Sequence, residues 1–157
     1  MSAARPVIVR ENPLGPDLTL LMARHTGDMH ADTPPESIHM MDASELAISD
    51  VAFYVMRLDD GPIGMGAFKR LEPGHAEIKS MHILLEYRGQ GLSRQMLDHL
   101  MAEAALVGIT LLSLETGAQA MFVAARRLYS KAGFEECAPF ADYRLDPNSV
   151  YMTRTLA

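Results

Sequence analysis

Residues 86–93 read Glu86-Tyr87-Arg88-Gly89-Gln90-Gly91-Leu92-Ser93 and stand between a predicted strand and a predicted amphipathic helix. The two glycines allow a tight turn and leave the neighbouring backbone N–H groups open to a ligand. These groups form the start of the helix, where unpaired donors and the helix dipole favour an anion. Arg88 and Arg94 add positive charge, so a diphosphate is the expected ligand, although a glycine-rich helix start can also be purely structural. The glycines are two apart and no Gly-Lys-Ser/Thr follows, which argues against a nucleotide P-loop and a dinucleotide fingerprint.

The sequence around this segment predicts a mixed α/β fold. After it, apolar residues recur at helical spacing, at Leu92, Met96, Leu97, Leu100, Met101 and Ala104. Before it, β-branched and aromatic stretches separated by turn residues predict an antiparallel meander with strands at 51–58, 62–71 and 76–84. A strand at 110–115, a helix at 119–132, a strand region from 134 and a strand at 150–156 follow. Such an order gives one central sheet with helices packed against it.

The first fifty residues are predicted to add a strand at 6–10, a helix capped by Asp17, and helical turns between 37 and 46 with Asp42 as a cap. In the strand at 51–58, Val51, Phe53 and Val55 should share one face, and Ala52, Tyr54 and Met56 the other.

Length and composition are those of one globular domain spanning residues 1–157. Apolar residues make up 48% and charged residues 22%, and no apolar run approaches the ~20 residues of a membrane span. The N-terminus lacks the apolar stretch of a secretory signal, so a cytoplasmic protein is expected. The lone Cys137 cannot form an intramolecular disulfide, and its acidic neighbours disfavour a thiolate.

The net charge of −6 is unevenly distributed. Residues 1–50 hold eight acidic and three basic side chains, a net of −5, and no basic nucleic-acid footprint is present. The acidic first third favours a cationic partner such as an amine, or is simply a solvated surface. The six histidines lack a tight metal-ligand spacing, so no metal site is expected.

Two motifs resemble those of the GCN5-related N-acetyltransferase (GNAT) family. Arg88, Gly91 and Ser93 match its Arg/Gln-x-x-Gly-x-Gly/Ala motif, and the stretch 79–84 before it resembles the cofactor-bearing fourth strand. Residues 125–134, Ala-Arg-Arg-Leu-Tyr-Ser-Lys-Ala-Gly-Phe, resemble the family signature Ala-x-x-Leu-Tyr-x-x-x-Gly-Phe. The stretches 34–39 and 114–117 are similar to a bacterial subgroup with poorly defined substrates.

The resemblance implies a mostly antiparallel sheet of six to seven strands with about four helices, and direct transfer of an acetyl group from acetyl-CoA to an amine. It also implies the cofactor contacts. The pantetheine would run along the backbone of Met81, His82 and Ile83, where a backbone N–H would hold the oxyanion. The diphosphate would bind at Arg88, Gly89, Gln90, Gly91, Leu92 and Ser93. Three positions depart from the family pattern, namely Ser93, Leu85 and Phe122; the last replaces an asparagine that contacts the cofactor in many members.

Tyr129 of the second motif is the predicted general acid for the departing thiolate, and it would also contact the cofactor; helix packing is the alternative role. Glu77 is the predicted general base, because its spacing to Gly91 is that of the glutamate in histone-modifying members. A plain surface pair between Glu77 and Lys79 is the alternative. Glu115 and His82 are reserve bases.

The acceptor is expected to be a primary amine of a small molecule or peptide, with no nucleic acid or membrane partner; a homodimer is possible. His25, Asp28, His30 and Glu36 lie in the segment that covers the acceptor site in the family. Two alternatives remain: a non-catalytic acyl-CoA sensor, and an O-acetyltransferase on the same fold.

Overall fold

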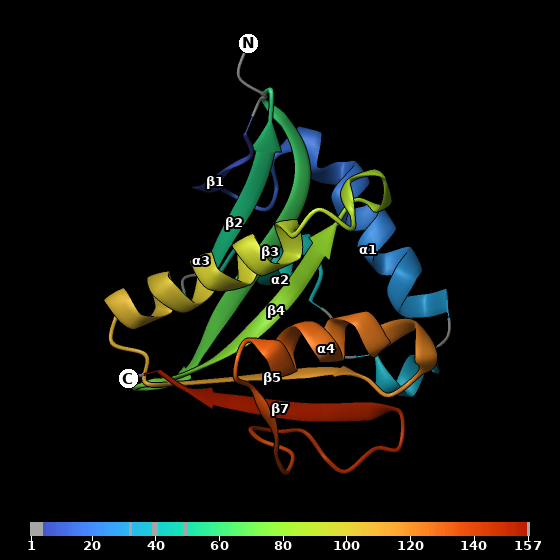
Figure 1. Ribbon diagram of the computed structural model, residues 1–157, viewed down its shortest axis with the longest axis vertical. Helices are drawn as coiled ribbons and strands as arrows, with labels where there is room; N and C mark the ends of the chain where they lie inside the picture. The colour runs from blue at the N-terminus through green and yellow to red at the C-terminus, as the bar shows by residue number, and fades with distance from the viewer. Residues whose placement is uncertain (1–4, 32, 39–40, 49, 157) are drawn as a thin grey trace.

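The computed structural model describes residues 5–31, 33–38, 41–48 and 50–156, and its centre is a seven-stranded sheet (Figure 1). The strand order is β1-β2-β3-β4-β5-β7-β6, and all neighbours are antiparallel except the parallel pair β4 and β5. The strands are β1 (Val7–Arg10), β2 (Val51–Leu58), β3 (Gly61–Glu72), β4 (His75–Ile83), β5 (Leu111–Gly117), β6 (Glu135–Glu136) and β7 (Ser149–Thr155). The predicted mixed α/β fold with a mostly antiparallel sheet is confirmed.

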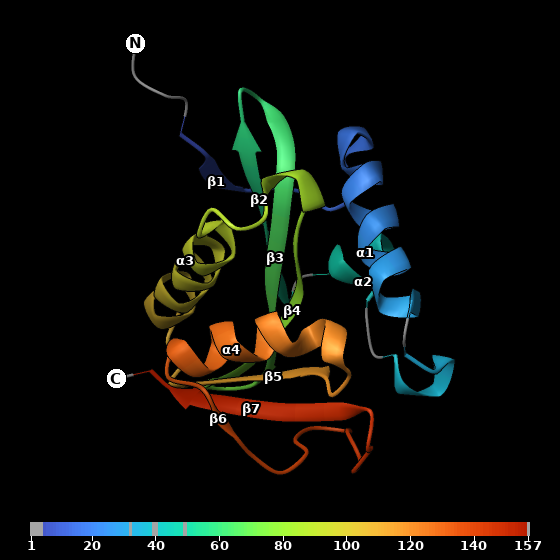
Figure 2. The same cartoon turned by 45° about the vertical axis from the view of Figure 1, so that its right-hand side comes forward.

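Helices cover both faces of the sheet. They are α1 (Thr19–Ala31), α2 (Ala43–Leu46), α3 (Leu92–Leu106) and α4 (Val123–Lys131), with short 3₁₀ turns η1 (Pro16–Leu18), η2 (Pro35–Ser37), η3 (Leu85–Tyr87) and η4 (Ala120–Phe122). Figure 2 shows α3 on one side of the sheet and α1 and α2 on the other, and α4 shares its apolar core with α3. Within the described residues, no helix combines the length and apolar character that a membrane span needs.

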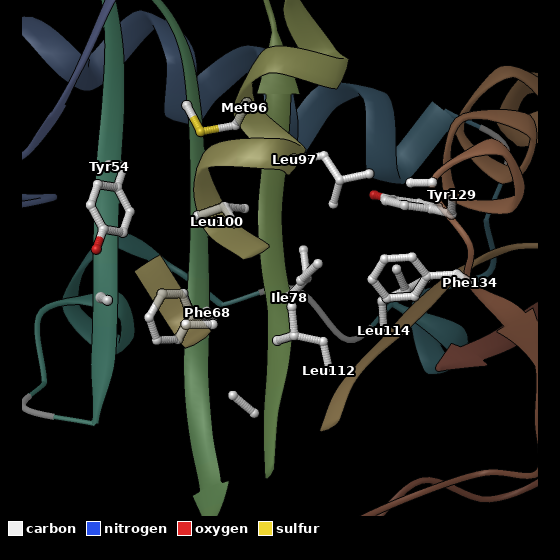
Figure 3. Packing of buried hydrophobic residues seen from close by; sticks show 14 of the residues in the cluster. Tyr54, Phe68, Ile78, Met96, Leu97, Leu100, Leu112, Leu114, Tyr129 and Phe134 are labelled. Atoms are coloured by element: carbon white, nitrogen blue, oxygen red, sulfur yellow. The ribbon is translucent and has the colours of Figure 1, made fainter. Parts of the chain in front are cut away.

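The two faces bury separate apolar cores, and β2 contributes to both. Tyr54 and Met56 belong to the core under α3 and α4, which Figure 3 shows with Leu97 and Leu100 of α3. Phe53 and Val55 belong to the core under α1 and α2. The predicted alternation in β2 is therefore confirmed, and it follows from side chains pointing to opposite faces at successive positions.

Strands β4 and β5 separate beyond their first residues. Along the described strands, parallel pairing joins only the segments 75–77 of β4 and 111–113 of β5. Ser80 has a φ of 55°, and the pairing of β4 with β3 shifts register there, as at a β-bulge. Figure 1 shows β5 and β7 running across the direction of β4. The second half of β4 thus has no partner on the β5 side.

The local predictions at helix starts had mixed outcomes. Asp42 caps α2, with a capping box in which its side chain accepts from the Glu45 N–H at 2.8 Å. The predicted cap at Asp17 is wrong, because Asp17 lies inside the turn η1 and its carboxylate pairs with Arg57 at 2.8 Å. An ion pair with a residue forty positions away has taken the carboxylate that a cap would use.

Candidate active site

A cleft of about 470 Å³ follows the gap between β4 and β5 and reaches the start of α3. Its walls come from α1, the second half of β4, the loop and first turn of α3, the end of β5, and α4. Most of the predicted site residues line it: Glu77, Met81, His82, Ile83, Arg88, Gly89, Gly91, Leu92, Ser93, Glu115 and Tyr129. Segments far apart in the sequence therefore meet around one opening.

The start of α3 offers a row of unpaired backbone donors to this cleft. Gly89 and Gly91 have φ values of 80° and 79°, and a Cβ at either position would meet open space. Gly91 is the N-cap and supplies no side-chain cap. In the part of the chain that the structure describes, the N–H groups from Gly89 to Arg94 donate to no protein acceptor, whereas the Gln95 N–H bonds the Gly91 carbonyl at 3.2 Å. Such donors at a helix start suit an anion.

The two arginines beside this loop are already paired with carboxylates. Arg88 donates from Nε to the Ile83 carbonyl at 2.8 Å and from a terminal nitrogen to Asp28 of α1 at 3.0 Å. Arg94 pairs with Asp98 one turn along α3 at 2.9 Å. Both arginines are over one-third exposed, so an incoming anion can compete for them. The positive charge predicted beside the loop is therefore present, but Asp28 and Asp98 partly neutralise it.

Tyr129 reaches the cleft from α4 and is almost fully buried. Its hydroxyl lies 3.9 Å from the Met81 sulfur on β4, and its ring packs edge-on against Phe134 with centroids 5.9 Å apart (Figure 3). Burial, with a smaller contribution from the Glu115 charge, raises the pKa of Tyr129 to about 12. The phenol therefore keeps its proton at neutral pH and can only donate it.

Glu77 is buried and held by two partners. Its carboxylate lies 3.2 Å from the Lys79 ammonium and accepts a hydrogen bond from the Tyr143 hydroxyl. Lys79 also donates to the Tyr143 oxygen at 2.9 Å. The side chains of Glu77 and Lys79 are 5% and 12% exposed, so this pair is an internal contact and not the surface pair considered from the sequence.

Glu115 lines the same gap from β5 and is only partly exposed. Burial raises its pKa from 4.5 to about 7, and the carboxylates of Glu77 and Asp146 add to that shift while Lys79 opposes it. A carboxyl with this pKa exchanges its proton near neutral pH. The geometry thus provides a second acid–base group opposite β4.

Two histidines lie where α1 meets β4. The rings of His25 and His82 contact edge to face with centroids 5.4 Å apart, and Asp28 is 3.8 Å from Nδ1 of His82. Burial is the largest cause that lowers the pKa of each histidine to about 4. Both imidazoles are therefore neutral at pH ~7, which makes His82 a weak proton acceptor.

Other candidates from the sequence are placed less centrally. Gln90 and His30 are exposed and do not line the cleft, whereas Glu36 lines a neighbouring cavity. Phe122 lies so close to Gly117 that a Cβ there would be 2.1 Å from its ring. Within the described residues, no group of three His, Cys, Asp or Glu side chains is arranged to hold a metal ion.

Three contacts around the cleft were not predicted from the sequence. Tyr143 bonds Glu77 across 66 positions, and Arg88 bonds Asp28 across 60. Arg24 of α1 also pairs with Glu86 beside the loop. No local pattern marks these partners; the opposite charges of positions 24, 28, 86 and 88 were the only available signal.

Comparisons with known proteins point to one family. Residues 21–134 match the sequence pattern of the family described as "Acetyltransferase (GNAT) family". The uncharacterized N-acetyltransferase YsnE of Bacillus subtilis is 42% identical over 142 residues, covering 90% of this chain and 94% of that protein. The IAA acetyltransferase of Azospirillum brasilense is 36% identical over 154 residues, and the match covers 95% of this chain and 97% of that protein. A solved structure from Klebsiella pneumoniae, described as an acyl-CoA N-acyltransferase, superposes with a TM-score of 0.78 at 28% sequence identity. The superposition covers 97% of this chain and 98% of that chain.

Proposed function

The chain belongs to the acetyltransferase (GNAT) family and is an acyl-CoA-dependent N-acyltransferase, and from that premise we propose that it transfers an acetyl group from acetyl-CoA directly to a primary amine of a small molecule or peptide. The observation that carries the proposal is the row of unpaired N–H groups from Gly89 to Arg94, at the mouth of a cleft that leads to Tyr129. A diphosphate at this helix start and a reactive group near Tyr129 would occupy the two ends of the cleft.

The exposed edge of β4 supports the proposed path of the pantetheine. The strand has no partner on the β5 side after Glu77, so the backbone groups of the stretch 81–83 that face this side are open to a ligand, apart from the Ile83 carbonyl, which accepts from Arg88. An extended amide-containing chain can pair with such an edge as an additional strand would. In this placement, a backbone N–H of β4 would stabilise the oxyanion that develops on the thioester carbonyl.

Tyr129 is proposed as the general acid. As the amine nitrogen attacks the carbonyl carbon, the C–N bond forms and the C–S bond breaks, and the sulfur needs a proton. The Tyr129 hydroxyl remains protonated, and its one contact in the described structure is the weak one with the Met81 sulfur. This hydroxyl is therefore free to hydrogen-bond the departing sulfur.

Glu115 is proposed as the group that takes the proton from the amine. A base works best when its pKa lies near the operating pH, and the pKa of Glu115 is about 7. Glu77, the first choice from the sequence, already interacts with Lys79 and Tyr143, in both cases through its Oε2 atom. Glu77 then has a supporting role, because its charge helps to raise the pKa of Glu115.

The proposal is tested by measuring release of free CoA thiol from acetyl-CoA with a panel of amines and alcohols, in wild type and Tyr129→Phe. We expect amine-dependent release in wild type, and a fall in kcat of about a hundredfold in the variant. The dissociation constant of CoA should change much less, since a packing residue would affect binding and turnover together.

Two outcomes would count against the proposal. Tight CoA binding without amine-stimulated release would identify a sensor, and release with alcohols alone would identify an O-acetyltransferase. Thermal unfolding of Tyr129→Phe serves as the control, because loss of one weakly bonded hydroxyl should cost less than about 1 kcal/mol.

A further inference from the structure

An ion pair between Asp28 of α1 and Arg88 connects two regions of the cleft. Arg88 belongs to the loop proposed to bind the diphosphate, and it donates a hydrogen bond to the Asp28 carboxylate at 3.0 Å. Asp28 and Glu115, the proposed base, both line this one cleft of about 470 Å³. The two carboxylates therefore border a single cavity.

The diphosphate proposed at the start of α3 competes with Asp28 for Arg88. The Arg88 Nε is fixed on the Ile83 carbonyl, so its terminal nitrogens are the donors that remain for Asp28 or for a phosphate. Guanidinium groups bind phosphates through two such donors. The side chains of Arg88 and Asp28 are 42% and 47% exposed, and exposed ion pairs of this kind are weak. Binding of the diphosphate would therefore leave Asp28 without its counter-ion.

The basic groups next to Asp28 are unable to take the place of Arg88. Arg24, one turn earlier on α1, is paired with Glu86. Nδ1 of His82 lies 3.8 Å from the Asp28 carboxylate, but burial lowers the pKa of His82, so its imidazole is neutral at pH ~7. An acidic side chain that loses its counter-ion in a cleft favours a cationic ligand there.

We propose that Asp28, once the diphosphate has taken Arg88 from it, binds a second cationic group of the acceptor, and that the preferred acceptors are short aliphatic diamines. The amine that reacts would lie at Glu115, and the ammonium at the other end of the molecule would lie at Asp28. This inference rests on the proposed function, since it concerns the amine that is acetylated. The excess of acidic over basic side chains in residues 1–50, which include α1, favours the same class of acceptor.

The register of the sheet gives a first measure of the distance between the two carboxylates. Extending the parallel pairing of β4 and β5 would place Glu115 level with Lys79. Asp28 lies beside His82, and the β3 partners of His82 and Lys79 are two residues apart, roughly 7 Å along the strand. The widening gap between β4 and β5 adds to this separation (Figure 1). A short aliphatic chain between the two amines is therefore needed to reach both carboxylates, and the preferred chain length reports their spacing.

Competition for Arg88 also couples the binding of the two substrates. An ammonium that binds Asp28 releases Arg88 to the diphosphate, so the acceptor should tighten the binding of CoA. By linkage, CoA should tighten the binding of the acceptor by the same factor. Because the ion pair is exposed, we expect a factor of about three. Free CoA carries no acetyl group and cannot react, so it measures this coupling without turnover.

The first experiment compares each diamine, with a butane, pentane or hexane backbone, against the amino alcohol of the same chain, by the rate of thiol release at saturating acetyl-CoA. Two equivalent amines alone give the diamine an advantage of about twofold, and binding at Asp28 should raise the ratio of kcat/KM to about fivefold or more. In Asp28→Asn the ratio should return to about twofold. Asp98→Asn is the matched control, because it frees Arg94 on α3 in the same way but lies outside the cleft, so it should keep the wild-type ratio.

The second experiment measures the dissociation constant of CoA at constant ionic strength, with and without a saturating diamine. The diamine should tighten CoA binding about threefold in wild type and in Asp98→Asn, and it should leave CoA binding unchanged in Asp28→Asn. The amino alcohol, which has one ammonium, should have a smaller effect.

The outcomes separate this inference from the proposed function. A ratio no greater than about twofold in wild type, with amine-dependent release intact, would overturn the role of Asp28 and leave the N-acetyltransferase standing. A diamine preference or a coupling to CoA that persists in Asp28→Asn would overturn that role as well. Absence of release with every amine would overturn the proposed function together with the acceptor preference.

Discussion

As the pH rises, Glu115→Gln should become more stable than wild type but less active than wild type. Glu115 is partly buried on β5, and this burial raises its pKa from 4.5 to about 7. One pKa unit corresponds to about 1.4 kcal/mol, so ionising the carboxyl in the folded protein costs about 3 kcal/mol more than in the unfolded chain. Glutamine has nearly the shape of the protonated form and does not ionise, so it removes this cost.

The direction in which stability changes with pH follows from how many protons the folded and unfolded states bind. Between pH 4.5 and about 7 the folded protein holds the Glu115 proton while the unfolded chain has lost it, so stability falls through this window and the loss is complete above it. His25 and His82 act in the opposite direction, since burial lowers their pKa from 6.5 to about 4 and the unfolded chain binds their protons more strongly. The histidines are common to both proteins, so their contribution largely cancels in the difference.

Urea unfolding at about pH 5 and about pH 8.5 measures this difference. We expect similar free energies of unfolding at the acidic pH, and a variant more stable than wild type by up to about 3 kcal/mol at the alkaline pH. Glu135→Gln, an exposed position on β6, is the control and should show no pH-dependent difference.

Activity should follow the opposite trend. Wild-type kcat/KM should rise with pH to a plateau above about pH 7 as Glu115 ionises, whereas the variant should be slower and lack this inflection. A stability difference that is the same at both pH values would refute the raised pKa. A variant that keeps the inflection would refute the role of Glu115 as the base.

Two further predictions concern the diphosphate site. Gly91→Ala places a Cβ among the open donors at a φ of 79°, so CoA affinity should fall at least tenfold in a titration, with a stability cost of roughly 1–2 kcal/mol. Gly108→Ala has a similar φ of 86° at the other end of α3, so it should show the same strain with unchanged affinity; equal losses of affinity would refute direct binding at Gly91. Asp28→Asn removes the charge that competes for Arg88, so CoA should bind a few-fold more tightly at low salt, and the gain should shrink as salt is added. Weaker binding in Asp28→Asn would instead show that Asp28 orients Arg88 for the ligand.

The fold could largely be predicted from the sequence because its signals are local. The β-branched and aromatic residues of 51–58 predicted a strand with two distinct faces, both of which are buried. The apolar residues that recur every four or five positions from Leu92 predicted a helix with one apolar face. The capping box at Asp42 involves residues three apart, so it was visible in the chain. Asp17 had the same kind of local signal, but Arg57 competes for it from β2.

The candidate site was predictable only where a motif marks it. Gly91 and Tyr129 were identified because their neighbours in the sequence match a known pattern. Tyr143 has no such neighbours, and its contact with Glu77 depends on how the loop before β7 folds back over β4. The raised pKa of Glu115 likewise depends on burial by distant segments, which sequence periodicity does not report.

The opening between β4 and β5 would allow the proposed acid and base to act on one thioester although they lie on opposite faces of the sheet. Tyr129 belongs to the core under α3 and α4 together with Leu114, so Glu115, the next residue of β5, points to the other face. In a continuous sheet, backbone and side chains would separate these two groups. Pairing ends at Glu77, so a thioester in the gap can be approached by the amine from one face while its sulfur faces Tyr129 on the other. In the proposed mechanism, proton removal and proton delivery would therefore take place on separate sides of the reacting carbon.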